Sequence, residues 1–247
     1  METEDILDTA LEAGLCLLEN GAETHRVEDT TERILAHYLG ENAEVIATLT
    51  GITVSHGSRS RSVRVKSRCI NLLKIIEVNQ LSRDITQENL SLSEAKQRLS
   101  TIRQLKPYGF LTKSLAYGVC CGFFANLFGG GLKDMAAGWI TGILLHGVVY
   151  FLSRKNVAPF LSTIAGGAAV GISAIGLRLL GLGENTEAVV IGSIMPLVPG
   201  MGITNALRDL SQGDYLSGGS RFFEAMITAL AVAAGAGGVM QLGRLLF

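Results

Sequence analysis

The chain has 247 residues, of which 48% are hydrophobic and only 17% charged, and its formal net charge is −1. An ordinary soluble domain carries about 25% charged residues, so the composition favours a membrane protein, while the near-zero charge argues against a nucleic-acid partner. The four cysteines lack CxxC spacing and a companion histidine pattern, which predicts reduced thiols and no metal site.

Charged and apolar residues are segregated along the chain. Residues 1–107 are mixed in character, whereas from residue 108 onward charges are sparse and apolar runs reach the length of a membrane span. The first residues, METEDILD, lack the basic and apolar segments of a signal peptide. We therefore predict a cytoplasmic domain over residues 1–107 and a transmembrane helical domain over residues 108–247.

The N-terminal third has the pattern of a small α+β domain with the order αα–ββ–αα. Two β-branched stretches, 44–56 and 61–67, are separated by GSRS, which predicts a hairpin of two strands. Apolar residues that recur every three or four positions predict four helices, over residues 5–18, 24–39, 70–85 and 91–105.

The segment GAETHRVEDT, residues 21–30, is richer in polar groups than a turn between two helices requires. One interpretation is capping, with Thr24 at a helix start and the acidic Glu23 and Glu28 near the positive end of the helix dipole. The other interpretation is a functional motif in the cytoplasmic domain. The residues by themselves leave both open.

The C-terminal part contains five apolar segments of about the 20 residues that a membrane crossing needs. Lysine and arginine cluster in the loops on the side of the N-terminal domain, so the positive-inside bias predicts a cytoplasmic N-terminus and an outside C-terminus. The predicted spans cover residues 108–128, 135–152, 158–180, 186–207 and 222–243.

Ionisable residues within these spans are candidates for function, because charge inside a bilayer is costly. Lys113 and Arg178 lie close enough to span ends for their charged groups to reach the interface. His146 lies mid-span, where it either makes a hydrogen bond between helices or contacts a proton or substrate.

The stretch IGSIMPLVPGMGITNALRDL interrupts the fourth span with Pro196, Pro199 and Gly200. Prolines remove backbone donors, and the carbonyls that they free need partners within lipid. Secondary transporters bind polar solutes and ions at such broken helices. The alternative is a proline kink with interfacial anchoring. The polar residues that follow could bind a carboxylate or relay charge: Asn205, Arg208 and Asp209.

Both motifs resemble signatures of a known family, the threonine/serine exporters. GAETHRVEDT resembles the N-terminal signature and MPLVPGMGITNALRDLSQGDYLSGGSRFFEA resembles the second one, in the expected order and distance. The resemblance implies a cytoplasmic α+β domain, a membrane domain that exports small polar metabolites, and coupling to the proton-motive force. It also gives functional weight to four residues of the first motif: Glu23, Thr24, Arg26 and Glu28.

Members of that family carry about ten spans, whereas five are predicted for this chain. It therefore resembles the split form, in which a smaller membrane protein supplies the other spans. Split members are linked to C4-dicarboxylates such as succinate, so two substrate classes stay open. We expect a small membrane partner subunit or a second copy of the chain, together with the lipid bilayer and a small polar solute.

These observations favour a subunit of a secondary transporter in the cytoplasmic membrane of a prokaryote. The alternative is a membrane-anchored accessory or regulatory protein whose cytoplasmic domain carries the activity. The chain has no Walker, GxSxG or HExxH motif, so we expect neither an enzyme nor a cofactor.

Overall fold

The computed structural model describes residues 2–40 and 43–246. The chain forms two compact units, and each is built from two stretches of sequence. The first unit comprises Met1–Pro107 with Met201–Phe222, and the second comprises Tyr108–Gly200 with Phe223–Phe247. Residues 201–222, which follow the prolines, therefore belong to the first unit.

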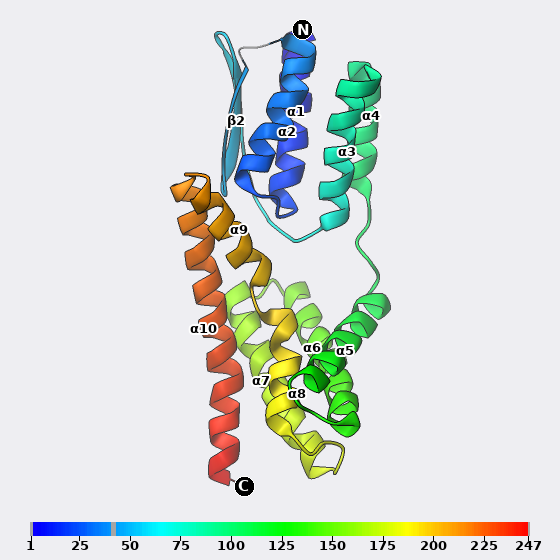
Figure 1. The fold of residues 1–247 in the computed structure, drawn as a ribbon, viewed down its shortest axis with the longest axis vertical. Helices are drawn as coiled ribbons and strands as arrows, with labels where there is room; N and C mark the ends of the chain where they lie inside the picture. Colours follow the sequence, from blue (N-terminus) through cyan, green and yellow to red (C-terminus); the bar gives the residue numbers. More distant parts are fainter. Residues whose placement is uncertain (1, 41–42, 247) are drawn as a thin grey trace. The chain divides into compact units, whose positions relative to one another are not determined.

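The first unit is layered, with the helix pair α1 and α2 packed between a sheet and the helix pair α3 and α4 (Figure 1). The apolar residues that predicted the first helix line this core, since Leu7, Leu11, Leu15 and Leu18 are all at most 9% exposed. The bounds are α1 Glu2–Glu19, α2 Thr24–Leu39, β1 Ala43–Thr48, β2 Gly51–His56, β3 Arg59–Arg64, α3 Leu72–Glu88 and α4 Leu92–Gln104.

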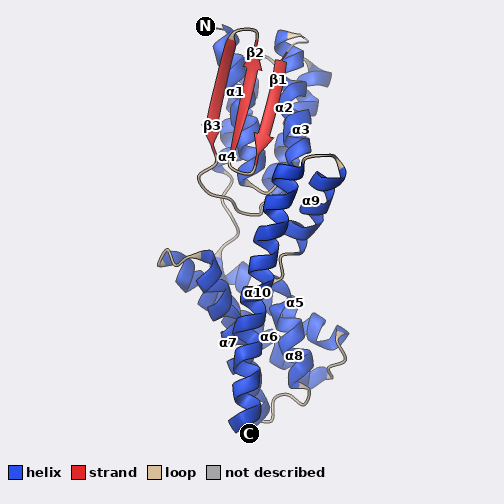
Figure 2. Ribbon diagram, turned by 90° about the vertical axis from the view of Figure 1, so that its left-hand side faces the viewer, coloured by secondary structure: helices blue, strands red, loops and turns tan. Residues whose placement is uncertain are grey.

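The sheet is an antiparallel meander of three strands in the order β1-β2-β3 (Figure 2). The hairpin predicted around GSRS is present as β2 and β3, but the stretch 44–56 holds two strands instead of one, because it folds back on itself. Thr48 pairs with Gly51, so Leu49 and Thr50 form the turn, and the Thr48 hydroxyl donates to the Gly51 carbonyl at 3.2 Å. The element order is αα–βββ–αα.

The second unit is helical, and its helices run between two opposite ends. The C-terminal ends of α7 and α10 line one cavity with the start of α8, as Arg178, Arg244 and Glu187 show. Successive helices therefore run in alternate directions. The elements are α5 Phe110–Leu127, α6 Leu132–Arg154, α7 Pro159–Leu179, α8 Thr186–Ile194 with the 3₁₀ turn η1 Met195–Leu197, and α10 Tyr215–Leu246, which belongs to this unit from Phe223 onward.

Four of these helices, α5, α6, α7 and α10, are long and apolar enough to cross a membrane. The segment 186–211 makes a fifth candidate only if two helices count together, because its two halves are bent by 54°. The second half is α9, Gly200–Ser211, and it belongs to the first unit from Met201 onward. The interruption predicted for the fourth span at Pro196, Pro199 and Gly200 is present as this bend, and the chain is a polytopic helical membrane protein.

Glycines allow the helices of the second unit to approach closely. A Cβ added to Gly235 of α10 would lie 2.2 Å from the Ile164 carbonyl of α7, and one added to Gly138 of α6 would lie 2.9 Å from the Cys121 carbonyl of α5. Helices that lack a hydrophobic driving force in lipid associate through such close contacts.

Candidate functional site

The loop between α1 and α2 presents two backbone carbonyls to the polar residues that follow the prolines. Gly21 takes a left-handed conformation with φ of 90°, and the Ala22 amide donates to the Leu17 carbonyl at 3.0 Å, as in a Schellman helix end. The Gly21 carbonyl accepts from the Asn205 side-chain amide at 3.1 Å, and the Ala22 carbonyl accepts from the Arg221 guanidinium at 2.7 Å.

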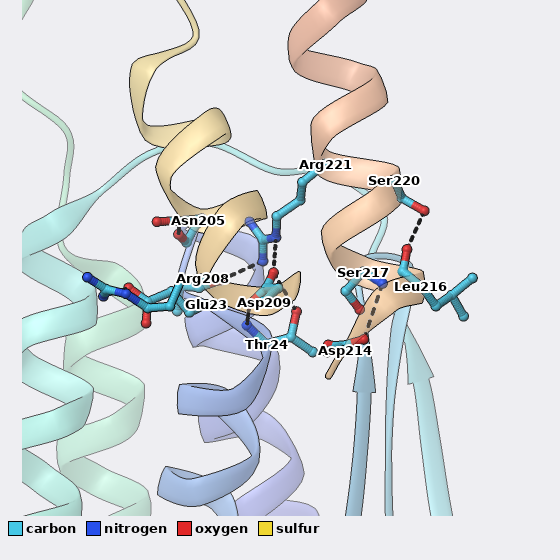
Figure 3. Close-up of polar contacts among 12 residues, drawn as sticks. Glu23, Thr24, Asn205, Arg208, Asp209, Asp214, Leu216, Ser217, Ser220 and Arg221 are labelled. Atoms are coloured by element: carbon cyan, nitrogen blue, oxygen red, sulfur yellow. Dashed lines mark hydrogen bonds and ion pairs between the residues drawn. The ribbon is translucent and has the colours of Figure 1, made fainter. Parts of the chain in front are cut away.

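The next residue of the loop, Glu23, and the first residue of α2, Thr24, both bind α9 (Figure 3). The carboxylate of Glu23, only 12% exposed, pairs with the half-exposed guanidinium of Arg208. The backbone amide and hydroxyl of Thr24 donate to the two carboxylate oxygens of Asp209, at 3.2 and 3.4 Å. We call this set the GAET network: Gly21, Ala22, Glu23, Thr24, Asn205, Arg208, Asp209 and Arg221.

This geometry corrects the capping interpretation of Thr24. Thr24 is the first residue of α2, and the preceding Glu23 makes no side-chain cap. The carboxylate of Asp209 accepts the free backbone amide instead, where the positive end of the helix dipole favours a negative charge. A residue 185 positions away thus caps the helix of the first motif.

Asp209 and Arg221 form a buried ion pair at the centre of the network. The distance between the Arg221 Nε and an Asp209 oxygen is 2.9 Å, and the two side chains are 8% and 0% exposed. A buried charge that loses its partner is costly, by about 3–5 kcal/mol. Both side chains make further contacts with the loop, so the pair fixes α9 and the start of α10 on the first motif.

The other two predicted residues of the first motif lie outside the network. Glu28 accepts a hydrogen bond from the Ala47 backbone amide at 2.8 Å, on the edge strand β1. Burial is the main cause of a raised Glu28 pKa, which the hydrogen bond from Ala47 only partly opposes. Glu28 therefore satisfies a backbone donor of the edge strand β1 that no neighbouring strand in the described residues covers. Arg26 is exposed, and within residues 2–40 and 43–246 no ion pair or hydrogen bond of its side chain is found.

The helix break lies in the second unit and is partly satisfied by its own backbone. The carbonyl of Met195, which Pro199 deprives of its usual donor, accepts from the Val198 amide at 3.2 Å. The Ser193 carbonyl accepts from the Cys121 thiol at 3.6 Å. The Ser193 hydroxyl itself is fully buried and has no hydrogen-bond partner in the described part of the chain.

His146 also lies in the second unit, 5% exposed. Its Nδ1 atom is 2.7 Å from the Ser114 hydroxyl, so it links α6 to α5. Phe110, Tyr117 and Tyr150 surround the imidazole, with ring centroids 5.0 to 6.0 Å away. The hydrogen bond between helices, one of the two interpretations left open by the sequence, is present.

The predicted pathway residues are thus divided between the two units. Pro196, Pro199, Gly200 and His146 lie in the second unit, whereas Asn205, Arg208 and Asp209 join Glu23 and Thr24 in the first. Sequence reasoning missed Arg221 and Ser114. The available signal for Arg221 was its place in the second motif, beside the start of a long apolar helix. Within the described residues no group of three His, Cys, Asp or Glu side chains could hold a metal ion.

The fold and the site define a polytopic helical membrane protein in which a broken helix leads into a polar network with an N-terminal α+β unit. The sequence model of one protein family, described as "Putative threonine/serine exporter", matches residues 8–243. The chain belongs to this threonine/serine exporter family, a family of transporters.

Individual relatives of this chain include both exporters and transporter subunits. It is 26% identical to the "Probable succinate transporter subunit YjjP" of Klebsiella aerogenes, over 95% of this chain and 92% of the relative. The protein of the same title from Escherichia coli K12 is 25% identical, over 95% and 94%. The "Threonine/serine exporter" of Corynebacterium glutamicum is 27% identical over 71% of this chain, which spans 37% of that longer protein. No solved structure matches the chain.

Proposed function

We propose that the chain is a subunit of a secondary transporter that exports small polar metabolites across the cytoplasmic membrane of a prokaryote. The candidate substrates are threonine and serine or a C4-dicarboxylate such as succinate, the solutes in the titles of the relatives. The coupling is to the proton-motive force.

The observation that carries this proposal is the broken helix of the second unit. A membrane anchor needs no interrupted span, whereas a transporter uses the polar backbone groups at the interruption. Here the interruption lies beside a fully buried hydroxyl, that of Ser193, which has no partner in the described residues. A buried polar group without a partner is costly, and a solute or ion that passes the break would supply the partner.

Arg208 supports a role of the GAET network in the same pathway. Its guanidinium is half exposed and bound to one carboxylate, that of Glu23. A guanidinium binds carboxylates through two parallel hydrogen bonds, so a solute carboxylate can compete with Glu23 for Arg208. Asp209 and Arg221, which are buried and paired with each other, hold the surrounding backbone in place.

The proposed orientation places the domain of residues 1–107 in the cytoplasm and the transmembrane domain of residues 108–247 with its C-terminus outside. Five traverses of the second unit bring the start of α5 and the end of α10 to opposite ends. Lysine and arginine are concentrated toward the N-terminal side, as the positive-inside rule requires.

We further propose that the chain works in a complex, either with a small membrane partner or with a second copy. Two relatives that the chain covers by more than nine-tenths are titled as subunits. Transporters built from repeats place their sites at the interface between repeats, so a single set of five traverses needs a second set.

The test is efflux from cells or proteoliposomes loaded with threonine or with succinate. The chain is assayed alone and with the product of the neighbouring gene. We expect Asn205→Ala and Arg208→Ala to lower the rate at least tenfold at equal protein level, and Arg208→Lys to restore it poorly because lysine lacks the planar fork. Arg83→Ala, which removes an exposed guanidinium from α3, is the matched control.

If both variants export at the wild-type rate, Asn205 and Arg208 are interfacial anchors, and the pathway must be sought around His146. If no preparation exports either solute although both units are folded, the proposed transport function is wrong. The chain would then be an accessory protein whose N-terminal unit carries the activity.

A further inference from the structure

A cavity of about 860 Å³ lies in the second unit, at the end where α7 and α10 finish and α6 and α8 begin. Small-molecule sites typically measure about 300–1,000 Å³. The cavity contains none of the residues of the GAET network or of the helix break. Its charged lining is formed by Asp134, Arg178, Glu184, Glu187 and Arg244.

Asp134 is a structural part of this cavity. It is 2% exposed and accepts three backbone hydrogen bonds, from Glu184 at 2.7 Å, Asn185 at 2.8 Å and Gly131 at 2.9 Å. These donors satisfy the carboxylate and tie the start of α6 to the loop before α8. Asp134 therefore needs no cation from the cavity.

Arg178 differs because its partner is neutral. It donates to the Thr186 hydroxyl at 3.3 Å, and that bond uses one of the five N–H groups of a guanidinium. The bond to Thr186 leaves the positive charge of Arg178 uncompensated. The Arg178 side chain lines the cavity, which it would not do if it extended to the membrane interface.

Arg244 supplies a second guanidinium. It pairs with Glu187 at 3.1 Å, and both side chains are more than two-thirds exposed. Exposed ion pairs contribute little to stability, so an incoming carboxylate can exchange with Glu187 at little cost. Once freed, the Glu187 carboxylate can accept from an ammonium group.

We propose that this cavity is a second binding site for small carboxylates, distinct from the GAET network, in which Arg178 binds the carboxylate. Arg244 binds the second carboxylate of a dicarboxylate, and Glu187 binds the ammonium group of an amino acid. The inference rests on the proposed function, because in the proposed orientation this end faces outside and the site receives the solute before release.

The test measures binding of succinate and of threonine to the purified full chain in detergent, by titration calorimetry. We expect Arg178→Gln to raise the Kd for both ligands at least tenfold and Arg178→Lys to raise it less. Arg244→Gln raises the Kd for succinate severalfold and leaves threonine nearly unchanged. Lys133→Gln is the matched control: it removes a cation at the same end, paired with Glu184 at 2.7 Å, from a residue outside the cavity lining.

The inference is overturned if the wild-type chain binds neither ligand, or if Arg178→Gln binds both as wild type does. It is also overturned if Lys133→Gln weakens binding as much as Arg178→Gln, because then only general charge matters. Failure of this site and failure of the proposed function can be told apart. Export with unchanged binding in Arg178→Gln removes this site and leaves the transport function, whereas Arg178-dependent binding without export removes the transport function and leaves the site.

Discussion

Asp209 joins both sequence motifs through a single carboxylate. It accepts from the Thr24 amide and hydroxyl and pairs with Arg221, and all three residues are buried. Such a residue has two roles that a substitution would remove together: neutralising a buried guanidinium and capping α2. Its neighbour Arg208 is half exposed and pairs with Glu23, so the two adjacent residues differ in what they can do for function.

Replacing Asp209 with Ala should therefore destabilise the first unit strongly. Arg221 would stay buried without its carboxylate, which costs about 3–5 kcal/mol, and the α2 N-terminus would lose a cap worth about 1 kcal/mol. Chemical unfolding of the full chain in detergent, followed by far-UV circular dichroism, measures the loss. Arg33→Ala, which removes the exposed Arg33–Asp29 pair, should change the free energy of unfolding by less than about 0.5 kcal/mol. An equally small effect of Asp209→Ala would contradict the buried pair.

Glu28 should make stability depend on pH in the acidic range. Burial raises its folded pKa above the ordinary value of 4.5, so the folded state binds more protons than the unfolded state and stability falls as pH rises through that range. The loss of stability caused by the buried charge is absent below the ordinary pKa of Glu28 and complete above its raised folded pKa. Glu28→Gln keeps an acceptor for the Ala47 amide and should flatten this part of the profile. Unfolding free energies at a series of pH values test it, and an unchanged slope would count against it.

Among the elements, the segment from α8 to α9 shows best how chain chemistry determines shape. α8 and η1 comprise nine and three residues, which span about 18 Å at 1.5 Å per residue. The hydrocarbon core is about 30 Å thick, so this half-helix ends within it or continues only through the extended residues around Pro199. In the proposed arrangement the break places backbone carbonyls at membrane depth, where protein or solute must satisfy them.

Pro199→Ala should restore a backbone donor and favour a continuous helix across this break. We expect a lower export rate together with a higher thermal unfolding temperature, because a continuous helix would give intrahelical partners to the backbone groups at the break. Efflux at equal protein level and thermal unfolding in detergent measure the two effects. A variant that loses both stability and transport would contradict this prediction. It would show that the bent backbone is the more stable conformation of the segment.

The contact between α7 and α10 gives a sharper test of helix packing. A Cβ on Gly235 would lie 2.2 Å from the Ile164 carbonyl, whereas one on Gly238 of the same helix meets no atom within 4 Å. Gly235→Ala should therefore force the two backbones apart and lower the unfolding temperature by several degrees. Gly238→Ala should keep or raise it, because alanine is the better helix former by about 1 kcal/mol. Equal effects of the two substitutions would argue against the close approach.

At the scale of the whole molecule, the sequence predicted elements with strong periodicity better than contacts between distant residues. The helix Thr24–Leu39 has the predicted bounds because its apolar spacing and the following Gly40 are local signals. The turn at Leu49 and Thr50 was missed because neither residue is typical of turns. The pairing of Thr24 with Asp209 spans 185 residues, and no local pattern specifies such a partner.

The whole chain should have its two ends on opposite sides of the membrane. The start of α5 and the end of α10 lie at opposite ends of the second unit, and the positive-inside bias predicts a cytoplasmic N-terminal end. Alkaline phosphatase, which is active only outside, should therefore be active when inserted at Glu184 or fused to the C-terminus. It should be inactive when inserted at Asn156, in the turn between α6 and α7. Fluorescent protein inserted at the same three positions should give the opposite pattern, which controls for expression. An inactive C-terminal phosphatase with an active one at Glu184 would mean that α10 does not complete a crossing, and the count would fall to four.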